Sequence, residues 1–204
     1  MMKRISLLVL FAATTLFVSC NDGNKKDSDA DETMTEENMD SDVEETDMKM
    51  EEEIKEVTFE LESKSNSSAT GKVSFVETNG QVKMTAKITG LEPGEHAIHI
   101  HEKADCSAPD GKSAGGHWNP TFDKHGQWGD PEGYHKGDIG NFMADENGDG
   151  TVSMTTDEWC IGCDDEKKNI LGKSIIVHQG ADDFTSQPSG AAGARVSCGG
   201  IIQM

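Results

Sequence analysis

The sequence predicts one all-β domain behind a long N-terminal region. Short segments that alternate apolar and polar residues, or run β-branched, predict strands, and turn dipeptides separate them. The 22 glycines and the 5% aromatic content indicate the same turn-rich, β-dominated class. The net charge is −20, from 18 basic and 38 acidic residues. This balance argues against a nucleic-acid partner, because phosphate binding needs Lys and Arg.

Residues 1–20 have the pattern of an export signal. Lys3 and Arg4 precede an apolar run, and Ser19 stands before Cys20. The run is shorter than the roughly 20 apolar residues of a membrane-spanning helix. The segment resembles a bacterial lipoprotein signal that ends at a lipidated Cys20; an ordinary cleaved signal is the alternative. Either predicts an exported protein, on a periplasm-facing membrane or the cell surface, where disulfides are allowed.

Residues 21–56 carry 16 acidic and 4 basic residues and almost no β-branched or aromatic side chains. Such a segment cannot bury a core, so we expect a disordered, self-repelling tether between the lipid and the domain. Methionine thioethers bind Cu(I), so one interpretation is that the tether captures copper. The other is that its methionines are unconstrained and have no specific role. The methionines in question are Met34, Met39, Met48 and Met50.

The domain is expected to span residues 57–204. Its strand candidates are residues 57–61, 72–76, 82–88, 97–102, 150–155, 173–178 and 194–198. Asn79-Gly80 is a hairpin dipeptide between the second and third candidates. The acidic segment 145–150 superficially suggests calcium, but it lacks the downstream bidentate Glu, so a hairpin turn is the better interpretation.

Histidines on two predicted strands suggest metal binding. His99 and His101 are two residues apart, so both rings project from one strand face and can reach one ion, although two solvated histidines would give the same pattern. His96 has the opposite parity, which indicates a packing or supporting residue. His178 ends an apolar strand, where it is either a satisfied core-edge residue or a further ligand.

The long segment 103–138 is rich in Gly, Asp, His and Pro, and a loop of that length is normally functional or disordered. Its three imidazoles and one carboxylate match a closed tetrahedral zinc site of the structural kind. A polar loop with scattered histidines is the alternative, but such a loop is entropically costly to order without a cross-link. The four candidates are His117, His125, His135 and Asp138.

These residues, in this order, resemble the copper/zinc superoxide dismutase family. The motifs that carry the resemblance are HIH at 99–101, GHWNP at 116–120, KHG at 124–126, HKGDIGN at 135–141, VHQGADD at 177–183 and GARVSCG at 193–199. The resemblance implies an eight-stranded antiparallel Greek-key β-barrel, an immunoglobulin-like sandwich architecture, with long metal-binding and channel loops outside the barrel.

The resemblance also implies one copper and one zinc ion per chain, which share the bridging His117. Copper would take His99, His101, His117 and His178. Zinc would take His117, His125, His135 and Asp138. In the same way, His96 would brace the copper loop, and Asp182 would link His99 to His125.

The implied activity is dismutation of superoxide to oxygen and hydrogen peroxide by Cu(II)/Cu(I) cycling, which would protect the cell envelope. Arg195 would hold the superoxide anion, and His117 would donate a proton. The alternative is a non-enzymatic copper/zinc-binding module, a metal chaperone or buffer on the same barrel. The channel loop, residues 182–195, contains no lysine, so Lys103 and Lys112 are candidates for steering the substrate. A homodimer stays open, because the strand residues do not distinguish a dimer surface from a core face.

The five cysteines divide into three groups. Cys20 is the lipidation site, and the resemblance implies that Cys106 and Cys198 form the family's disulfide. Cys160 and Cys163 depart from the family pattern. We expect a small local disulfide there rather than a redox-active pair or a metal site.

Overall fold

The computed structural model describes residues 53–203. The predicted signal, its lipidation site and the tether methionines lie outside this range. Among the described residues, no helix is long and apolar enough to cross a membrane. The strands are β1 Lys55–Ser63, β2 Thr70–Thr78, β3 Gln81–Thr89, β4 Gly94–His101, β5 Gly140–Ala144, β6 Gly150–Thr156, β7 Ser174–His178 and β8 Arg195–Gly200, with one short 3-10 helix, η1, at Lys112–Ala114.

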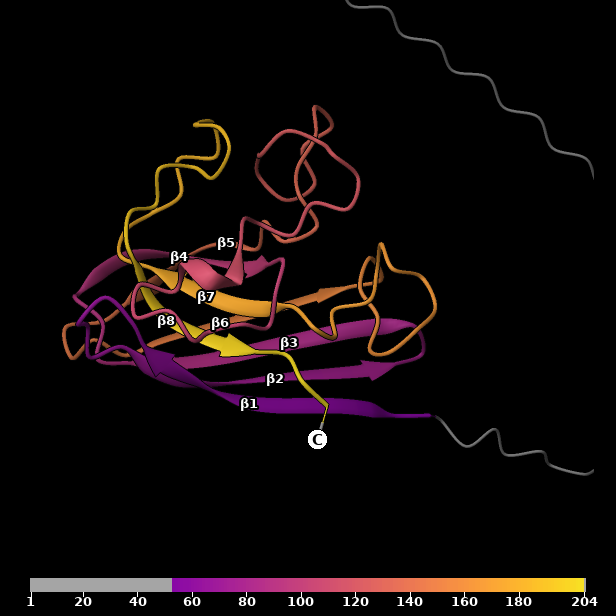
Figure 1. Ribbon diagram of the computed structural model, residues 1–204, viewed down its shortest axis with the longest axis horizontal. Helices are drawn as coiled ribbons and strands as arrows, with labels where there is room; N and C mark the ends of the chain where they lie inside the picture. The colour runs from indigo at the N-terminus through magenta and orange to yellow at the C-terminus, as the bar shows by residue number, and fades with distance from the viewer. Residues whose placement is uncertain (1–52, 204) are drawn as a thin grey trace, which may run out of the picture. The chain divides into compact units, whose positions relative to one another are not determined.

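The strands close into an antiparallel barrel in the order β1-β2-β3-β6-β5-β4-β7-β8. The connections from β3 to β4 and from β6 to β7 cross between non-adjacent strands, which gives the Greek-key topology. Pairing of β1 with β8 at Glu62 and Cys198 closes the barrel. The predicted all-β Greek-key barrel is therefore confirmed. Figure 1 shows the long loops after β4 and β7 rising together on one side of it.

Seven strands match the candidates from sequence, and β5 was not predicted. This strand has five residues and begins with a glycine and an asparagine, so it carries little intrinsic strand propensity. Its pairing with β4, from Gly94 opposite Ala144 to Ile98 opposite Gly140, holds it extended. A strand that depends on a partner distant in sequence is not visible in a local pattern.

Strand β1 begins at Lys55, two residues before the expected domain start. Lys55 lies opposite Glu77 and Glu56 opposite Val76, in register with β2. The expected tether boundary at residue 56 therefore falls inside the first strand. Main-chain hydrogen bonds between strands do not depend on side-chain polarity. The two charged residues Lys55 and Glu56 can therefore extend β1 at its N-terminal end.

The core lies inside the barrel and follows the alternation of the strands. On β2 and β3, Val73, Phe75, Val82 and Met84 are fully buried, and their neighbours face outward. Burial of each such side chain contributes about 1.5–3 kcal/mol relative to exposure. All of β7 is buried, because the loops after β4 and β7 cover its outer face. Side chains that point outward there reach a covered site rather than solvent.

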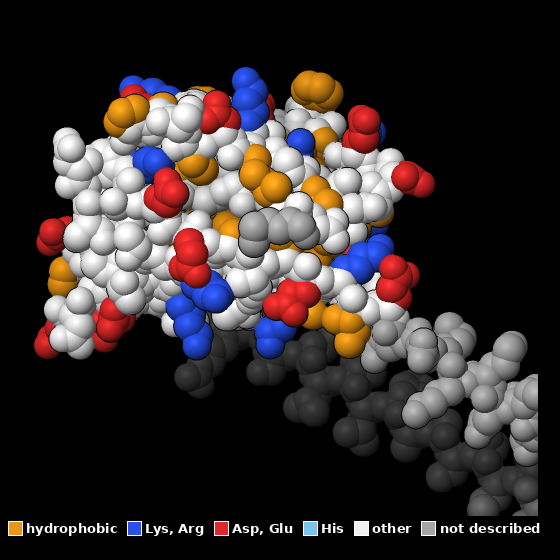
Figure 2. Space-filling model, turned by 60° about the horizontal axis from the view of Figure 1, so that its bottom comes forward, with side chains coloured by type: hydrophobic (Ala, Val, Ile, Leu, Met, Phe, Trp, Pro, Cys, Tyr) orange, Lys and Arg blue, Asp and Glu red, His pale blue; other side chains and the backbone are white. Residues whose placement is uncertain are grey.

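The face of the barrel in Figure 2 has a different character. Acidic and basic side chains are interspersed with small apolar patches, and no histidine is visible on it. All seven histidines are buried, with exposed fractions of 6% or less. Histidine is thus concentrated under the loops, away from this face.

Residues 145–149 of the acidic segment form the turn between β5 and β6, and Gly150 begins β6. The Asp145 carboxylate accepts hydrogen bonds from the main-chain N–H groups of Asn147 and Asp149, and Gly148 N donates to the Asp145 carbonyl. The hairpin interpretation is confirmed, since these carboxylate oxygens serve the turn itself.

Candidate metal centre

The structure brings the seven predicted ligand residues into two adjacent groups that share His117. Within each group, one possible ligand atom per residue lies within 4.8 Å of all the others, and every member is buried. The first group is His99, His101, His117 and His178. The second is His117, His125, His135 and Asp138. Four imidazoles suit copper, and three imidazoles with one carboxylate suit zinc.

Main-chain hydrogen bonds hold the loop ligands beside β4. Trp118 N donates to the Ile100 carbonyl at 2.8 Å, Ile100 N to the Gly137 carbonyl, and Gly137 N to the Trp118 carbonyl. His101 and His117 also face each other in an isolated β-bridge. A Cβ at Gly137 would overlap the Ile100 carbonyl oxygen, so this contact requires glycine. The loop is therefore fixed on the barrel where its ligands are needed.

In the first group, buried ring nitrogens without a hydrogen-bond partner converge. They include His99 Nδ1, His101 Nε2 and His117 Nε2, and both ring nitrogens of His178. The opposite nitrogens of two rings are held: His99 Nε2 donates to Asp182 Oδ2 at 2.8 Å, and His101 Nδ1 to the Gly115 carbonyl at 3.0 Å. One nitrogen fixed by an outer partner and one left free is the arrangement of a metal-bound imidazole. Buried polar atoms without partners are destabilising, so these residues fit a metal ion.

In the second group, three rings surround one carboxylate. Nδ1 of His117 lies 2.8 Å from Asp138 Oδ1, Nδ1 of His125 2.9 Å from Oδ2, and Nδ1 of His135 3.3 Å from Oδ1. Burial alone would raise the pKa of Asp138, but the hydrogen bonds from the three rings outweigh it and hold that pKa far below its usual range. The carboxylate is ionised at neutral pH, as a zinc ligand must be.

Burial keeps three of the copper-side rings, those of His101, His117 and His178, neutral. Desolvation, followed by the neighbouring His117 and His178, lowers the pKa of His101 well below its usual value, and burial likewise lowers that of His178. The pKa of His117 falls to about 4, because its burial outweighs the hydrogen bond to Asp138. Neutral rings have a lone pair available for a metal, so these shifts favour metal binding.

Asp182 joins the two groups. It accepts from His99 Nε2 through Oδ2 and from His125 Nε2 through Oδ1, at 2.8 and 2.9 Å. Phe184 N also donates to Oδ1. A Cβ at Gly190, whose φ is +68°, would overlap this carboxylate, so glycine makes room for the link. Asp182 therefore connects a ring of the first group to a ring of the second.

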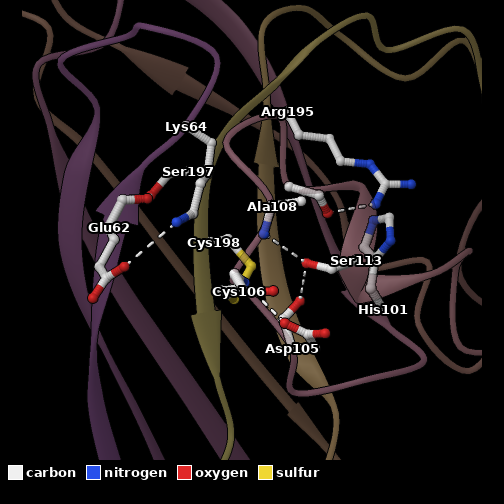
Figure 3. Close-up of a disulfide and its surroundings, with 12 residues drawn as sticks. Glu62, Lys64, His101, Asp105, Cys106, Ala108, Ser113, Arg195, Ser197 and Cys198 are labelled. Atoms are coloured by element: carbon white, nitrogen blue, oxygen red, sulfur yellow. Dashed lines mark hydrogen bonds and ion pairs between the residues drawn. A yellow bond between two sulfur atoms is a disulfide. The ribbon is translucent and has the colours of Figure 1, made fainter.

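Arg195 lies beside the first group at an open pocket of about 710 Å³, whose lining includes His101, His117 and His178. Its guanidinium donates to the carbonyls of Gly111 and Gly115, at 2.9 and 2.8 Å. The Gly115 carbonyl also accepts from His101 Nδ1, so one oxygen ties the guanidinium to a ring of the first group. Figure 3 shows Arg195 extending toward His101, with the Cys106–Cys198 disulfide close by.

Comparison with known proteins agrees with this geometry. The family model "Copper/zinc superoxide dismutase (SODC)" matches residues 69–201. The chain belongs to the copper/zinc superoxide dismutase family. It is 40% identical over 136 residues to Superoxide dismutase [Cu-Zn] 2 of Aquifex aeolicus, which covers 64% of this chain and 78% of the relative. It is 35% identical over 154 residues to the extracellular superoxide dismutase [Cu-Zn] of Haemonchus contortus, covering 70% and 79%.

A solved structure of a superoxide dismutase-like protein from Bacillus subtilis is also similar. It has a TM-score of 0.63 and 32% identity, and the match covers 71% of this chain and 97% of that one. Membership of the copper/zinc superoxide dismutase family makes the protein an oxidoreductase with superoxide as its substrate. It also implies one copper and one zinc ion, for which the two histidine groups are suited.

Two predicted supporting features have clear places in this dismutase fold. His96 is buried, with Nδ1 2.8 Å from the His178 carbonyl and Nε2 2.7 Å from the Glu92 carbonyl, so it braces the main chain of a copper-side residue. The expected Cys160–Cys163 disulfide is present in the loop between β6 and β7, and neither cysteine belongs to a metal group.

Two functional features were missed from sequence. The Gly115 carbonyl leaves no sequence signal, because every residue carries one. Gln187 contacts the main chain of His125, and only the Gln-Pro dipeptide near Asp182 could have directed attention to it. Both are contacts to main-chain atoms, which a search for chemically distinctive side chains does not find.

We expect zinc binding to the metal-free protein to release about one proton from His125 at pH 7. Burial opposes protonation, but hydrogen bonds to Asp138 and Asp182 raise the pKa of His125 to about 9. Because this folded-state pKa is above the ordinary value, the group stabilises the metal-free fold most fully at low pH, and less as pH rises through about 9. Zinc affinity should therefore increase up to that pH.

Isothermal titration calorimetry checks this, because proton release makes the heat depend on the ionisation enthalpy of the buffer. Equal heats in two buffers of different ionisation enthalpy at pH 7 would contradict the expectation.

Proposed function

We propose that the protein dismutates superoxide outside the cytoplasm, with the ligand sets assigned above. Bound copper would supply a Cu(II)/Cu(I) couple that accepts an electron from one superoxide and returns it to a second, while zinc is redox-inert. The observation that carries the proposal is Arg195, a fixed cation at the open pocket that shares the Gly115 carbonyl with His101. A binding module has no need of an anion site beside its copper.

Arg195 binds and orients the anion. A guanidinium stays charged at any working pH, and its two hydrogen bonds to Gly111 and Gly115 fix its position before substrate arrives. Burial lowers the pKa of Arg195, yet the group remains a cation at neutral pH. Binding of superoxide there places it against the copper-side rings, so the electrostatic attraction also positions it.

His117 supplies a proton on the copper side. Its Nδ1 faces the zinc group and its Nε2 is buried without a hydrogen-bond partner, so the two nitrogens face different groups. With Nδ1 directed at the zinc group, a neutral His117 ring would carry its single proton on Nε2, where it can be passed to the product. We assign His117 as bridging ligand and proton donor for the peroxide product.

The test is metal content together with dismutation rate on the mature protein loaded with copper and zinc. One copper and one zinc per chain with rapid dismutation supports the enzyme. Full occupancy of both metals without dismutation would instead support the alternative, a non-enzymatic chaperone or buffer. Nothing in the described part of the chain favours that alternative, since the ligand sets and Arg195 are complete.

Export and lipid attachment at Cys20, followed by the 21–56 tether, complete the proposal. Two disulfides fit an oxidising compartment, and the leader has the lipoprotein pattern. Dismutation at the envelope would then protect it from superoxide. Partitioning of the cell-expressed protein into a detergent phase checks the anchor; unchanged partitioning in Cys20→Ser would remove it.

We expect salt to change the dismutation rate by well under the roughly tenfold that strong electrostatic steering confers. Lys112 is paired with Asp110 at 3.0 Å, and Glu102 and Asp123 bring negative charge to the pocket lining. Of the two lysines named from the sequence, Lys103 is then the remaining steering candidate.

The measurement is rate against ionic strength for the wild type and for Lys103→Gln with Lys112→Gln. A steep fall with salt in the wild type, lost in the double variant, would restore these lysines as steering residues.

A further inference from the structure

One side chain of the channel loop makes two hydrogen bonds to the main chain of a predicted zinc ligand. Gln187 Oε1 accepts from His125 N at 2.9 Å, and Gln187 Nε2 donates to the His125 carbonyl at 2.9 Å. Within residues 53–203, no other hydrogen bond satisfies the main-chain N–H or C=O of His125. The amide therefore pairs with His125 as a neighbouring strand would, across 62 residues of sequence.

The loop is built to present this amide. The Asp183 carboxylate accepts from the N–H groups of Thr185 and Ser186, at 2.9 and 2.8 Å. Asp183 N donates to the Gly190 carbonyl, and Gly190 N donates to the Ser186 carbonyl. These bonds connect the two ends of the segment 183–190, which includes Gln187. The main chain around Gln187 is therefore already ordered, so the side-chain amide loses little conformational entropy when it bonds to His125.

We propose that Gln187 is a positioning residue for zinc, which acts by fixing the main chain of His125. The His125 ring must keep Nδ1 at the zinc group, 2.9 Å from Asp138, while Nε2 bonds to Asp182. Asp182 orients the ring, and Gln187 fixes the backbone from which the ring projects. The next residue, Gly126, donates to Asp138 Oδ2, so movement of this backbone also disturbs the carboxylate.

The same contact shapes the substrate channel. Gln187, Pro188 and Ser189 line the pocket beside Arg195. The two hydrogen bonds between Gln187 and His125 therefore connect the wall of this pocket to the loop that carries His125. Groups that hold a metal ligand from outside typically change metal affinity by about 10–100-fold when they are removed. Because the Gln187 side chain is exposed, water competes for its bonds, and we expect the lower end of that range.

The test compares Gln187→Glu with Gln127→Glu in the full-length mature holoprotein. The first variant replaces the donor that faces the His125 carbonyl with a second acceptor. Gln127 is an exposed glutamine two residues after His125, and its side chain makes no hydrogen bond in the described part of the chain. Its variant therefore reproduces the charge change alone. The two measurements are the rate of zinc loss to a chromogenic chelator and the melting temperature of the metal-free protein.

We expect zinc loss to be about tenfold faster in Gln187→Glu and within twofold of wild type in Gln127→Glu, with the melting temperature of the metal-free protein unchanged. Equal zinc-loss rates in the two variants would overturn the inference, since the effect would then be electrostatic or absent. Faster zinc loss accompanied by a lower melting temperature of metal-free Gln187→Glu than of the metal-free wild type would also overturn it, because Gln187 would then have a merely structural role.

The inference rests on the zinc assignment proposed above, which elemental analysis of the wild type tests first. A wild type without zinc would refute both; normal zinc content with unchanged loss in Gln187→Glu would refute this inference alone.

Discussion

His178→Ala is expected to remove copper and superoxide dismutation while zinc stays bound. His178 belongs only to the first group and is 4% exposed. Loss of an outer-shell partner already costs about 10–100-fold in metal affinity or activity, so loss of a direct ligand should lower the rate by more than about a hundredfold. The zinc group shares only His117 with the copper group, so its own ligands stay in place.

The measurement is copper and zinc content with dismutation rate, beside Gln179→Ala as a control. Gln179 follows His178 in the chain and belongs to neither metal group, and we expect its variant to keep both metals and the rate. A His178→Ala protein that retains copper and full activity would contradict the copper assignment. Loss of both metals from this variant would contradict the independence of the two groups.

The members of the two candidate metal groups were predictable because strand parity and residue type carry the information. Odd-numbered His99 and His101 share one face of β4, while Ile98 and Ile100 fill the core on the other. The same parity argument separated His96 from the ligands. His178 was ambiguous from its own strand, because a histidine at the end of an apolar strand has several uses.

The remaining features depend on contacts between distant segments. Strand β5 is extended because β4 pairs with it, and β1 starts early because β2 does. The anchor of Arg195 at Gly115 is a main-chain oxygen, and the partner of Gln187 is the main chain of His125. Lys112 was a steering candidate from the sequence, but in the structure it is paired with Asp110. Tertiary structure decides each of these, and side-chain identity does not.

Serine substitution of both Cys106 and Cys198 is expected to lower the stability of the protein strongly. It is also expected to lower activity by more than the loss of folded protein explains. The bond joins residues 92 apart with a Cα–Cα distance of 5.8 Å. In the chain-entropy account, closure of a loop of this length contributes roughly 4–5 kcal/mol. For a protein of this size, that loss lowers the melting temperature by roughly 10–20 °C.

Activity should fall further than the unfolded fraction explains, because the same bond positions Arg195. Cys198 lies on β8 three residues after Arg195, and Cys106 lies in the loop whose Gly111 and Gly115 carbonyls receive the guanidinium. Without the bond, both partners of that contact can move relative to the copper group. We therefore expect a lower rate at temperatures where the variant is fully folded and metal-loaded.

The matched control is serine substitution of Cys160 and Cys163, which are three residues apart. A loop this short restricts the unfolded chain far less, and neither cysteine belongs to a metal group or to the loop that holds Arg195, so its loss should cost less stability and leave the rate per folded, metal-loaded molecule unchanged. Calorimetric melting and dismutation rate, both normalised to metal content, separate the two variants. Equal losses of melting temperature would show that loop length does not govern the stabilisation. A normal rate in folded Cys106→Ser/Cys198→Ser would show that the Gly111 and Gly115 carbonyls alone are sufficient to hold Arg195 in place.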